Sequence, residues 1–248
     1  MIFINKYKSP NFNNRKKGSS IDYIIIHYTA LETDNSAISY LTDKKNKVSC
    51  HFLISKSGKV YNLVNESKRA WHAGKSRWNN LTDINSYSIG IELDYLGLNK
   101  KNNNYSTIQI QSLIKLLKFL INKYKIDKSN ILGHSDIAPY RKIDPGSKFP
   151  WHKISNENLS FFPKKSKKIE INKLEKNFKI NLLKTKKLKA IFMLKKIGYD
   201  INLVSQNRKR YQLLIKAYQA RFRQNLVSGR LDNETYSIIL CHYNQLLT

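Results

Sequence analysis

The sequence has few cysteines, few acidic residues and no long hydrophobic run, and each shortage excludes a class of protein. Only two cysteines occur in 248 residues, Cys50 and Cys241, and they lie far apart, so a disulfide-stabilised scaffold is not expected. No apolar run approaches the length of a transmembrane helix. The apolar stretch at the amino terminus is too short for a signal peptide, so the chain either is not exported or is a mature form.

Acidic residues are scarce: 17 Asp and Glu stand against 45 Lys and Arg, which gives a formal net charge of +28. The excess is +13 over residues 1–150 (24 basic, 11 acidic) and +15 over the remainder (21 basic, 6 acidic), so basic character extends over the whole chain. A polyanionic partner is therefore expected. Nucleic acid, a cell-wall polymer with free carboxylates and an anionic membrane surface would each satisfy this charge.

Strand patterns dominate the first half of a chain whose composition, 41% hydrophobic and 25% charged, is that of a folded protein. A continuous β-branched and aromatic run predicts a buried strand over residues 22–29. Two further β-rich runs, 50–55 and 59–64, are separated by a short glycine-containing segment, which is typical of a hairpin. Strands are also expected at 87–93 and 130–132.

Helical patterns complete the domain plan. Ser106 has the residue type of an N-cap, and apolar residues at helical spacing follow it as far as Tyr124. Strands and helices mixed in this order predict an α/β domain over residues 1–160, with a mixed central sheet flanked by helices. The lysine-rich segment 161–187 is typical of an exposed linker. Residues 188–248 are predicted to form a small all-α domain, with helices at 188–197, 208–222 and 233–240.

Three segments place a metal-ligating side chain beside small or rigid residues. His27 ends the first strand, His134 follows a glycine after the last strand, and Asp144 precedes Pro-Gly. Two imidazoles and a carboxylate would give zinc three protein ligands and leave a fourth position for water, the arrangement of catalytic zinc sites. Each residue alone also has an ordinary explanation, as a hydrogen-bonded core histidine or as a turn-forming aspartate.

Longer strings around these residues add a family resemblance. Five strings occur in order: IIIHYTA, SCHFLISKSGKVYNLV, AWHAGKSRWNN, SIGIEL and GHSDIAPYRKIDPGSKFPW. Together they resemble the type-2 N-acetylmuramoyl-L-alanine amidases, zinc amidases related to the peptidoglycan recognition proteins, and in particular their AmiD-like branch. The resemblance covers about residues 22–151 and implies that family's α/β fold.

Carried over residue by residue, the resemblance implies that His27, His134 and Asp144 bind one zinc ion. Glu92, in SIGIEL, falls at the place of the family's general base. Lys142 falls at the place of a cation near the scissile carbonyl. Without the metal motif, both residues would be read as ordinary surface charges.

The same resemblance indicates substrate-binding residues. Trp71, His72 and Ala73 lie in a segment that lines the substrate cleft in the family, and Arg141 is expected to contact a substrate carboxylate. Some relatives carry a tyrosine that assists catalysis at the place of Cys50. The thiol departs from that pattern and leaves the catalytic role to Glu92.

The expected activity is zinc-dependent hydrolysis of the amide bond between N-acetylmuramic acid and L-alanine in peptidoglycan or muropeptides, in cell-wall remodelling or recycling. Carboxylates of the stem peptides would then account for the basic surface. The alternative is a non-catalytic peptidoglycan recognition module. A nucleic-acid-binding protein is a weaker alternative, because no nucleic-acid-binding signature occurs, and nucleic acid is not expected as a partner. The bacterial cell envelope, in the periplasm, is the favoured location over the cytoplasm.

The carboxy-terminal string AYQARFRQNLVSGRLDNETYSIIL, residues 217–240, resembles a peptidoglycan-binding helical module. Seven residues match that module: Ala217, Tyr218, Gln219, Phe222, Gly229, Asp232 and Thr235. Aromatic-rich helices of this spacing also occur as plain hydrophobic core. The sequence therefore leaves open whether residues 188–248 contact the wall or only pack on the catalytic domain.

Overall fold

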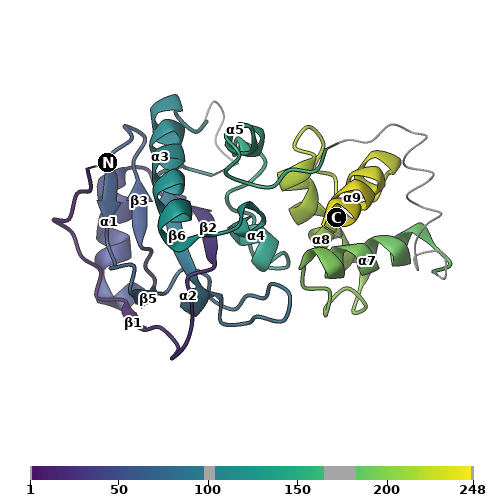
Figure 1. The fold of residues 1–248 in the computed structure, drawn as a ribbon, viewed down its shortest axis with the longest axis horizontal. Coiled ribbons are helices and arrows are strands. Elements are labelled where there is room, and N and C mark those ends of the chain that lie inside the picture. The colour runs from purple at the N-terminus through teal and green to yellow at the C-terminus, as the bar shows by residue number, and fades with distance from the viewer. Residues whose placement is uncertain (1, 98–103, 165–182, 247–248) are drawn as a thin grey trace.

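The computed structural model describes residues 2–97, 104–164 and 183–246. Figure 1 shows a sheet flanked by helices in the amino-terminal part and a group of helices at the carboxy-terminal end. The predicted fold class, a mixed α/β domain with a central sheet, is confirmed. Both cysteines are free and buried, as expected from their separation in the sequence.

Five strands form the main sheet in the order β4-β3-β6-β2-β7. Neighbouring strands from β3 to β7 run parallel, and β4 pairs antiparallel with β3 as the predicted hairpin at one edge. The strands span Tyr23–Tyr28 (β2), Phe52–Ile54 (β3), Val60–Asn62 (β4), Ser88–Leu93 (β6) and Ile131–Gly133 (β7). A separate two-stranded sheet pairs β1, Phe12–Asn14, with β5, Lys68–Ala70.

The central strand β2 is buried on both faces, which explains its continuous apolar sequence. Ile24 and Ile26 point to one face and pack in a cluster with helix α3, Thr107–Tyr124. Ile25 points to the other face and belongs to a cluster that includes residues of the carboxy-terminal helices. Alternation of side chains along the strand thus joins two hydrophobic cores through one sheet.

The remaining helices of the amino-terminal part are short, and they fill the sheet edges and connections (Figure 1). Ser106 caps α3 as predicted, because its Oγ accepts a hydrogen bond from the backbone N of Gln109 over 3.1 Å. The short helices span Asp34–Thr42 (α1), Ile84–Tyr87 (α2), His134–Ile137 (α4) and Trp151–Asn156 (α5). Of these, α4 carries one of the predicted metal ligands.

Three helices follow in what we call the helical segment, residues 183–246. They span Lys186–Ile197 (α7), Arg208–Phe222 (α8) and Asn233–Gln245 (α9). Each begins after a capping side chain that accepts a backbone hydrogen bond: Thr185, Asn207 and Asp232. The helices lie where the sequence predicts them, and α9 extends five residues beyond the expected end. Most of the predicted linker, residues 165–182, lies outside the described part of the chain.

The helical segment packs closely on the sheet. Leu132 of β7 and Trp78 share one buried cluster with apolar residues of α7, α8 and α9. Gly198, at the end of α7, has a φ of +128°, and a Cβ there would lie 2.5 Å from the Trp78 ring. Its carbonyl accepts a hydrogen bond from the backbone N of Asn79 over 2.7 Å. The helical segment therefore covers one face of the sheet near β2 and β7.

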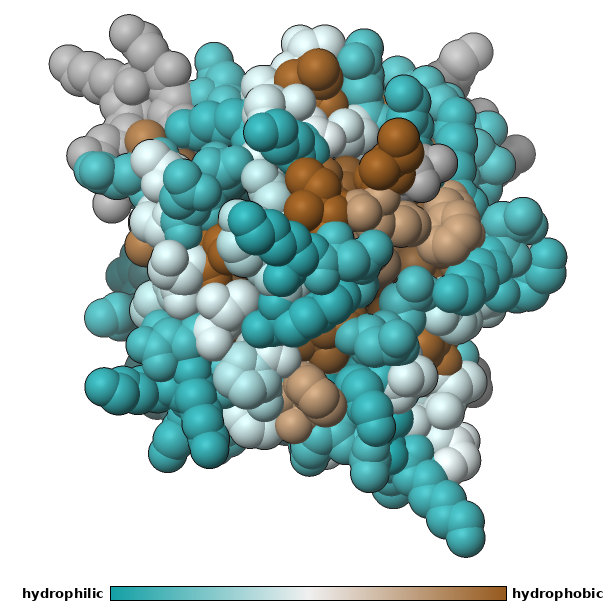
Figure 2. All heavy atoms as spheres, turned by 90° about the vertical axis from the view of Figure 1, so that its left-hand side faces the viewer, coloured by the Kyte–Doolittle hydropathy of each residue, from teal (hydrophilic) through white to brown (hydrophobic). Residues whose placement is uncertain are grey.

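The surface reflects the charged composition. Figure 2 shows the face at the left of Figure 1, where hydrophilic side chains cover most of the area around one group of hydrophobic residues. Across residues 2–97, 104–164 and 183–246, no helix combines the length and the apolar character that crossing a membrane requires.

Candidate active site

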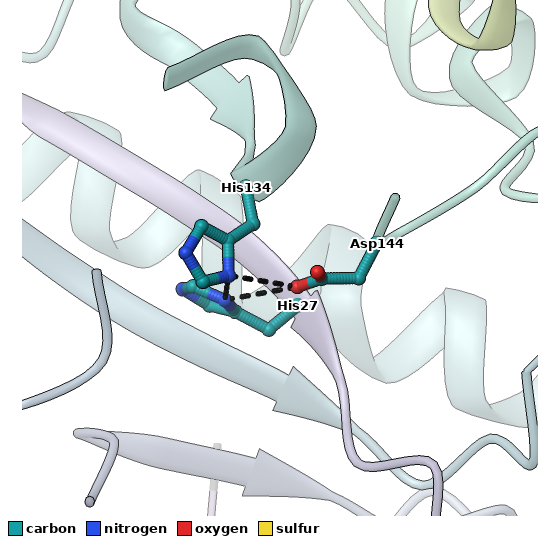
Figure 3. Close-up of side chains that lie close together, drawn as sticks. All are labelled: His27, His134 and Asp144. Atoms are coloured by element: carbon teal, nitrogen blue, oxygen red, sulfur yellow. Dashed lines mark hydrogen bonds and ion pairs between the residues drawn. The ribbon is translucent and has the colours of Figure 1, made fainter. Parts of the chain in front are cut away.

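Parallel strand pairing brings the two candidate histidines together. His27 is the fifth residue of β2, and His134 is the first residue of α4, directly after β7. Because Ile26 and Gly133 are register partners in the β2–β7 pair, the residues that follow them leave the sheet at the same edge. Asp144, in the loop after α4, points toward both imidazoles (Figure 3).

The three side chains have the spacing of a metal site. His27 Nδ1 lies 2.9 Å from His134 Nδ1, and Asp144 Oδ2 lies 3.2 Å from the first and 3.0 Å from the second. All three residues are buried, and they form a group able to hold a metal ion. In a tetrahedral zinc site with bonds of about 2.0–2.1 Å, ligand atoms are about 3.3 Å apart. The observed distances therefore fit zinc after a small expansion.

A chain of hydrogen bonds leaves the Nδ1 atom of His27 without a proton. The Ser88 hydroxyl donates to the Ile84 carbonyl over 2.7 Å, so Ser88 Oγ accepts from His72 Nε2 over 3.2 Å. His72 Nδ1 must then accept the hydrogen bond that His27 Nε2 donates over 3.0 Å. A neutral imidazole carries one N–H, so His27 presents the lone pair of Nδ1 to a metal.

A single hydrogen bond also leaves the Nδ1 atom of His134 without a proton. His134 Nε2 donates to the carbonyl of Ala73 over 3.1 Å, which leaves its Nδ1 without a proton. Arg141 Nη2 donates to the same carbonyl over 2.8 Å. Both histidines therefore offer Nδ1 toward Asp144, and both have the second ring nitrogen bonded within the protein, as metal-ligating histidines usually do.

The protonation states match metal binding. Burial lowers the pKa of His27 to about 4, and the neighbouring His134 adds to the decrease. Burial opposes ionisation of Asp144, but a proton on His134 or His27 holds the pKa of this carboxyl well below its usual range. A neutral imidazole and an ionised carboxylate are the forms that coordinate a metal ion.

Glu92 lies beside the candidate metal site on the neighbouring strand. It is the register partner of His27 in the β2–β6 pair. Its Oε2 atom is buried and has no hydrogen-bond partner among the described residues. Burial raises the pKa of the Glu92 carboxyl to about 8, Asp144 adds to the increase, and Lys142 opposes it. Such a carboxyl can exchange a proton near neutral pH.

Three predicted residues remain open to solvent near the site. Lys142 is half-buried, and its charge lowers the pKa of both His27 and Glu92. Trp71 is also half-buried. Arg141 is exposed, although its Nη2 atom is held by backbone carbonyls. The positions of Lys142 and Arg141 are compatible with the substrate contacts expected from the sequence. The Trp71 indole donates from Nε1 to Oδ1 of Asn13 in β1 over 2.9 Å.

His72 and Ala73 are placed differently from what the sequence led us to expect. His72 is 5% exposed and has both ring nitrogens bonded within the protein. Its ring packs against Gly90, where a Cβ would lie 2.4 Å away. The Ala73 side chain is buried in the core, and its carbonyl accepts from His134. The structure therefore favours a supporting role behind the histidines in place of the expected substrate contact.

Sequence reasoning missed two further supporting residues. Ser88 completes the chain of hydrogen bonds behind His27. Asp136 Oδ2 accepts a hydrogen bond from the backbone N of Gly133 over 2.8 Å, directly before His134. Both residues lie inside strings that carried the family resemblance, so the sequence signalled their location and not their role.

Comparisons with known proteins agree with this geometry. Residues 17–147 match the family model described as N-acetylmuramoyl-L-alanine amidase. The chain belongs to this amidase family. It is 36% identical to the N-acetylmuramoyl-L-alanine amidase AmiD of Escherichia coli over 230 aligned residues, which cover 88% of this chain and 80% of AmiD. It is 34% identical to the 1,6-anhydro-N-acetylmuramyl-L-alanine amidase AmpD of Haemophilus influenzae, over 59% of this chain and 87% of AmpD.

Solved structures of amidases extend the similarity to the helical segment. The complex of E. coli AmiD with the substrate anhydro-N-acetylmuramic acid-L-Ala-D-gamma-Glu-L-Lys has a TM-score of 0.79 at 31% identity, and it covers 94% of this chain and 93% of AmiD. AmpDh3 of Pseudomonas aeruginosa has a TM-score of 0.80 at 26% identity and covers 100% of this chain. The amidase fold and the carboxy-terminal helices therefore occur together in these relatives.

Proposed function

We propose that this chain hydrolyses the amide bond between N-acetylmuramic acid and L-alanine in peptidoglycan or muropeptides. The observation that supports this most is the buried group of His27, His134 and Asp144 beside Glu92, whose buried Oε2 atom has no hydrogen-bond partner in the described part of the chain. The group would hold one zinc ion through two Nδ1 atoms and one carboxylate oxygen. Zinc bound there would lower the pKa of a coordinated water and polarise the substrate carbonyl.

The neighbouring residues supply the proton transfer and a positive charge. Glu92 accepts a proton from the attacking water and delivers it to the departing amide nitrogen. Lys142 places its ammonium near the carbonyl oxygen, where it offsets the negative charge that grows during the attack. Trp71 and Arg141 contact the substrate beside the site, and the Arg141 guanidinium suits a carboxylate of the stem peptide.

Anhydro-muropeptides are the substrate class that the relatives favour. E. coli AmiD was solved with such a molecule, and AmpDh3 was solved with an anhydromuramic pentapeptide. The peptide part of these molecules carries free carboxylates, so a net charge of +28 would raise the encounter rate. Peptidoglycan as substrate favours the bacterial cell envelope, in the periplasm, as the location, whereas soluble muropeptides would also suit the cytoplasm.

The structure weighs against the two alternatives considered for the sequence. A non-catalytic recognition module has no need for three metal-ligating side chains with bare donor atoms beside a carboxyl that can exchange a proton. A nucleic-acid-binding protein is supported only by the basic composition.

We further propose that the helical segment adds a contact to the cell-wall polymer. A hollow of about 330 Å³ on its surface is lined by four cationic side chains and one aromatic ring, and no acidic residue lines it. These residues, which we call the cationic hollow, are Lys186, Lys187, Arg208, Tyr211 and Arg230. Carboxylates of the stem peptides fit this charge and would bring the catalytic part near its substrate.

A defined anhydro-muropeptide tests the amidase proposal. Incubation with the purified chain should release the intact stem peptide, which mass spectrometry identifies, and a chelator should stop the reaction until zinc is restored. His134→Ala should abolish both zinc retention and product formation, because it removes one of three ligands. His152→Ala is the matched control, since His152 is exposed on α5 and faces Phe162. Full zinc content and full activity in His134→Ala would refute the ligand assignment.

A further inference from the structure

A buried ion pair joins the helical segment to the turn that carries His134. Arg221 of α8 donates from Nη1 to Oδ2 of Asp136 over 2.6 Å. The two side chains are 4% and 1% exposed, respectively. A charge in such a position is costly unless its partner is present, so loss of either residue leaves the other uncompensated.

The Asp136 carboxylate has a partner on each oxygen. The Tyr199 hydroxyl, just after α7, donates to Oδ1 over 2.6 Å. The backbone N of Gly133 donates to Oδ2 over 2.8 Å, in addition to Arg221. Gly133 immediately precedes His134. Arg221 and Tyr199 therefore hold the Asp136 carboxylate, which in turn holds the backbone just before the candidate ligand His134.

Arg221 also holds the strand before this turn. Its Nη2 atom donates to the carbonyl of Ile131, the first residue of β7, over 2.9 Å. Its guanidinium lies 4.3 Å from the centre of the Trp151 ring. The planar guanidinium therefore bonds to both ends of a six-residue stretch, from Ile131 to Asp136, that contains His134.

We propose that Arg221 and Tyr199 are positioning residues for the metal site, and that they act through Asp136 on the backbone that orients His134. The inference rests on the proposed zinc site but concerns its construction. Within the described part of the chain, the helical segment contributes no side chain to the group of candidate ligands. It instead prevents the His134 turn from relaxing away from His27 and Asp144.

Zinc affinity tests the proposal without reference to the amidase reaction. Competition with a chelating indicator should give a zinc dissociation constant about 10- to 100-fold higher for Arg221→Met, as for other supporting residues behind metal ligands. Tyr199→Phe removes one hydroxyl and should raise the constant by a smaller factor. With Co²⁺ as the probe, the visible absorption of both variants should shift, because it reports ligand geometry.

A matched control lies two residues further along the chain. Arg223 is also buried, and its guanidinium pairs with Asp232 and Glu234, both within the helical segment. Arg223→Met should therefore lower the midpoint of thermal unfolding and leave the zinc dissociation constant and the Co²⁺ spectrum unchanged. Arg221→Lys keeps the charge without the planar donor pair and should recover part of the affinity lost in Arg221→Met.

Two outcomes separate this inference from the proposed function. If the unmodified protein binds no zinc, the metal site itself is wrong. If it binds zinc and both Arg221→Met and Tyr199→Phe bind it with unchanged affinity and an unchanged Co²⁺ spectrum, the positioning role is wrong. Should Arg221→Met fail to fold, Tyr199→Phe decides the question, since it keeps the ring and its packing.

Discussion

The amidase sheet and the helical segment contribute to the same site in different ways. The sheet positions the candidate metal ligands and the proposed proton carrier, with His27 and Glu92 as register partners and His134 after the neighbouring strand. The helical segment supplies a buried arginine and a tyrosine that reach Asp136. Chemistry is thus located at strand ends, whereas part of the rigidity that it requires comes from helices beyond the family-matched residues 17–147.

His27 and His134 lie side by side but are oriented by different parts of the molecule. His27 is oriented by side chains of the sheet part, through His72 and Ser88. His134 is oriented by the Ala73 carbonyl and by a turn that Asp136 ties to the helical segment. Loss of support on one side should therefore leave the support on the other side intact.

The largest effect is expected from Glu92→Gln, because Glu92 is the proposed proton carrier. Glutamine keeps the shape of the side chain but cannot accept and deliver a proton, so turnover of an anhydro-muropeptide should fall by roughly two to four orders of magnitude. Zinc content should stay unchanged, since Glu92 is no ligand. Metal analysis and product quantification by mass spectrometry check both statements.

Glu157→Gln provides the control for this change. Glu157 is an exposed residue that pairs with Lys118 on the surface, and its replacement should leave turnover intact. If Glu92→Gln is as active as Glu157→Gln, Glu92 does not transfer the proton and is an ordinary strand-end residue.

A smaller effect is expected from His72→Ala, which removes the side chain in the α/β domain that orients His27. His27 Nε2 loses its acceptor, so the ring can rotate or change tautomer, and zinc affinity should fall about 10- to 100-fold. The neighbouring His51 is the control, because its ring nitrogens contact Gly90, Lys68 and Arg15 and not His27. Equal zinc dissociation constants for His72→Ala and His51→Ala would contradict the chain of hydrogen bonds proposed here.

Much of the amino-terminal α/β domain could be predicted, because the sequence patterns that indicate its strands and helices are local. A buried strand, a capped helix and a hairpin each follow from a short stretch of residues, and the candidate ligands follow strand ends inside strings that resemble a family. The helices of the helical segment could be placed in the same way. Their bounds agree with the capping residues Thr185, Asn207 and Asp232.

The supporting contacts could not be predicted because they join distant residues. Arg221 and Asp136 are 85 positions apart. Arg221 follows Leu214 and Tyr218 at helical spacing on the buried face of α8, but this spacing does not identify the partner of its charge. The sequence predicts a substrate contact for His72, whereas in the structure both of its ring nitrogens are bonded within the protein. The supporting role proposed for it depends on which ring nitrogen carries the proton. That assignment requires the positions of Ser88 and Ile84.

The smallest effect is expected at the cationic hollow, which concerns attraction to the wall and not the metal site. Deleting the whole helical segment would expose the core that it shares with the sheet and break the Arg221–Asp136 pair, so point variants are needed. The double variant Lys187→Gln and Arg230→Gln should bind insoluble peptidoglycan roughly two- to fivefold more weakly, as expected for the loss of two exposed ion pairs worth about 0.2–0.5 kcal/mol each.

Net charge is the competing explanation for wall binding, and a second double variant tests it. Lys115→Gln and Lys125→Gln remove the same charge from exposed positions at α3. Retention on the wall should fall with ionic strength for every variant, because salt screens exposed charges. If the two double variants lose retention equally at each salt concentration, attraction depends only on the overall charge. A larger loss for the hollow variant, with zinc affinity unchanged in both, would assign the helical segment a wall contact separate from its contact with the His134 turn.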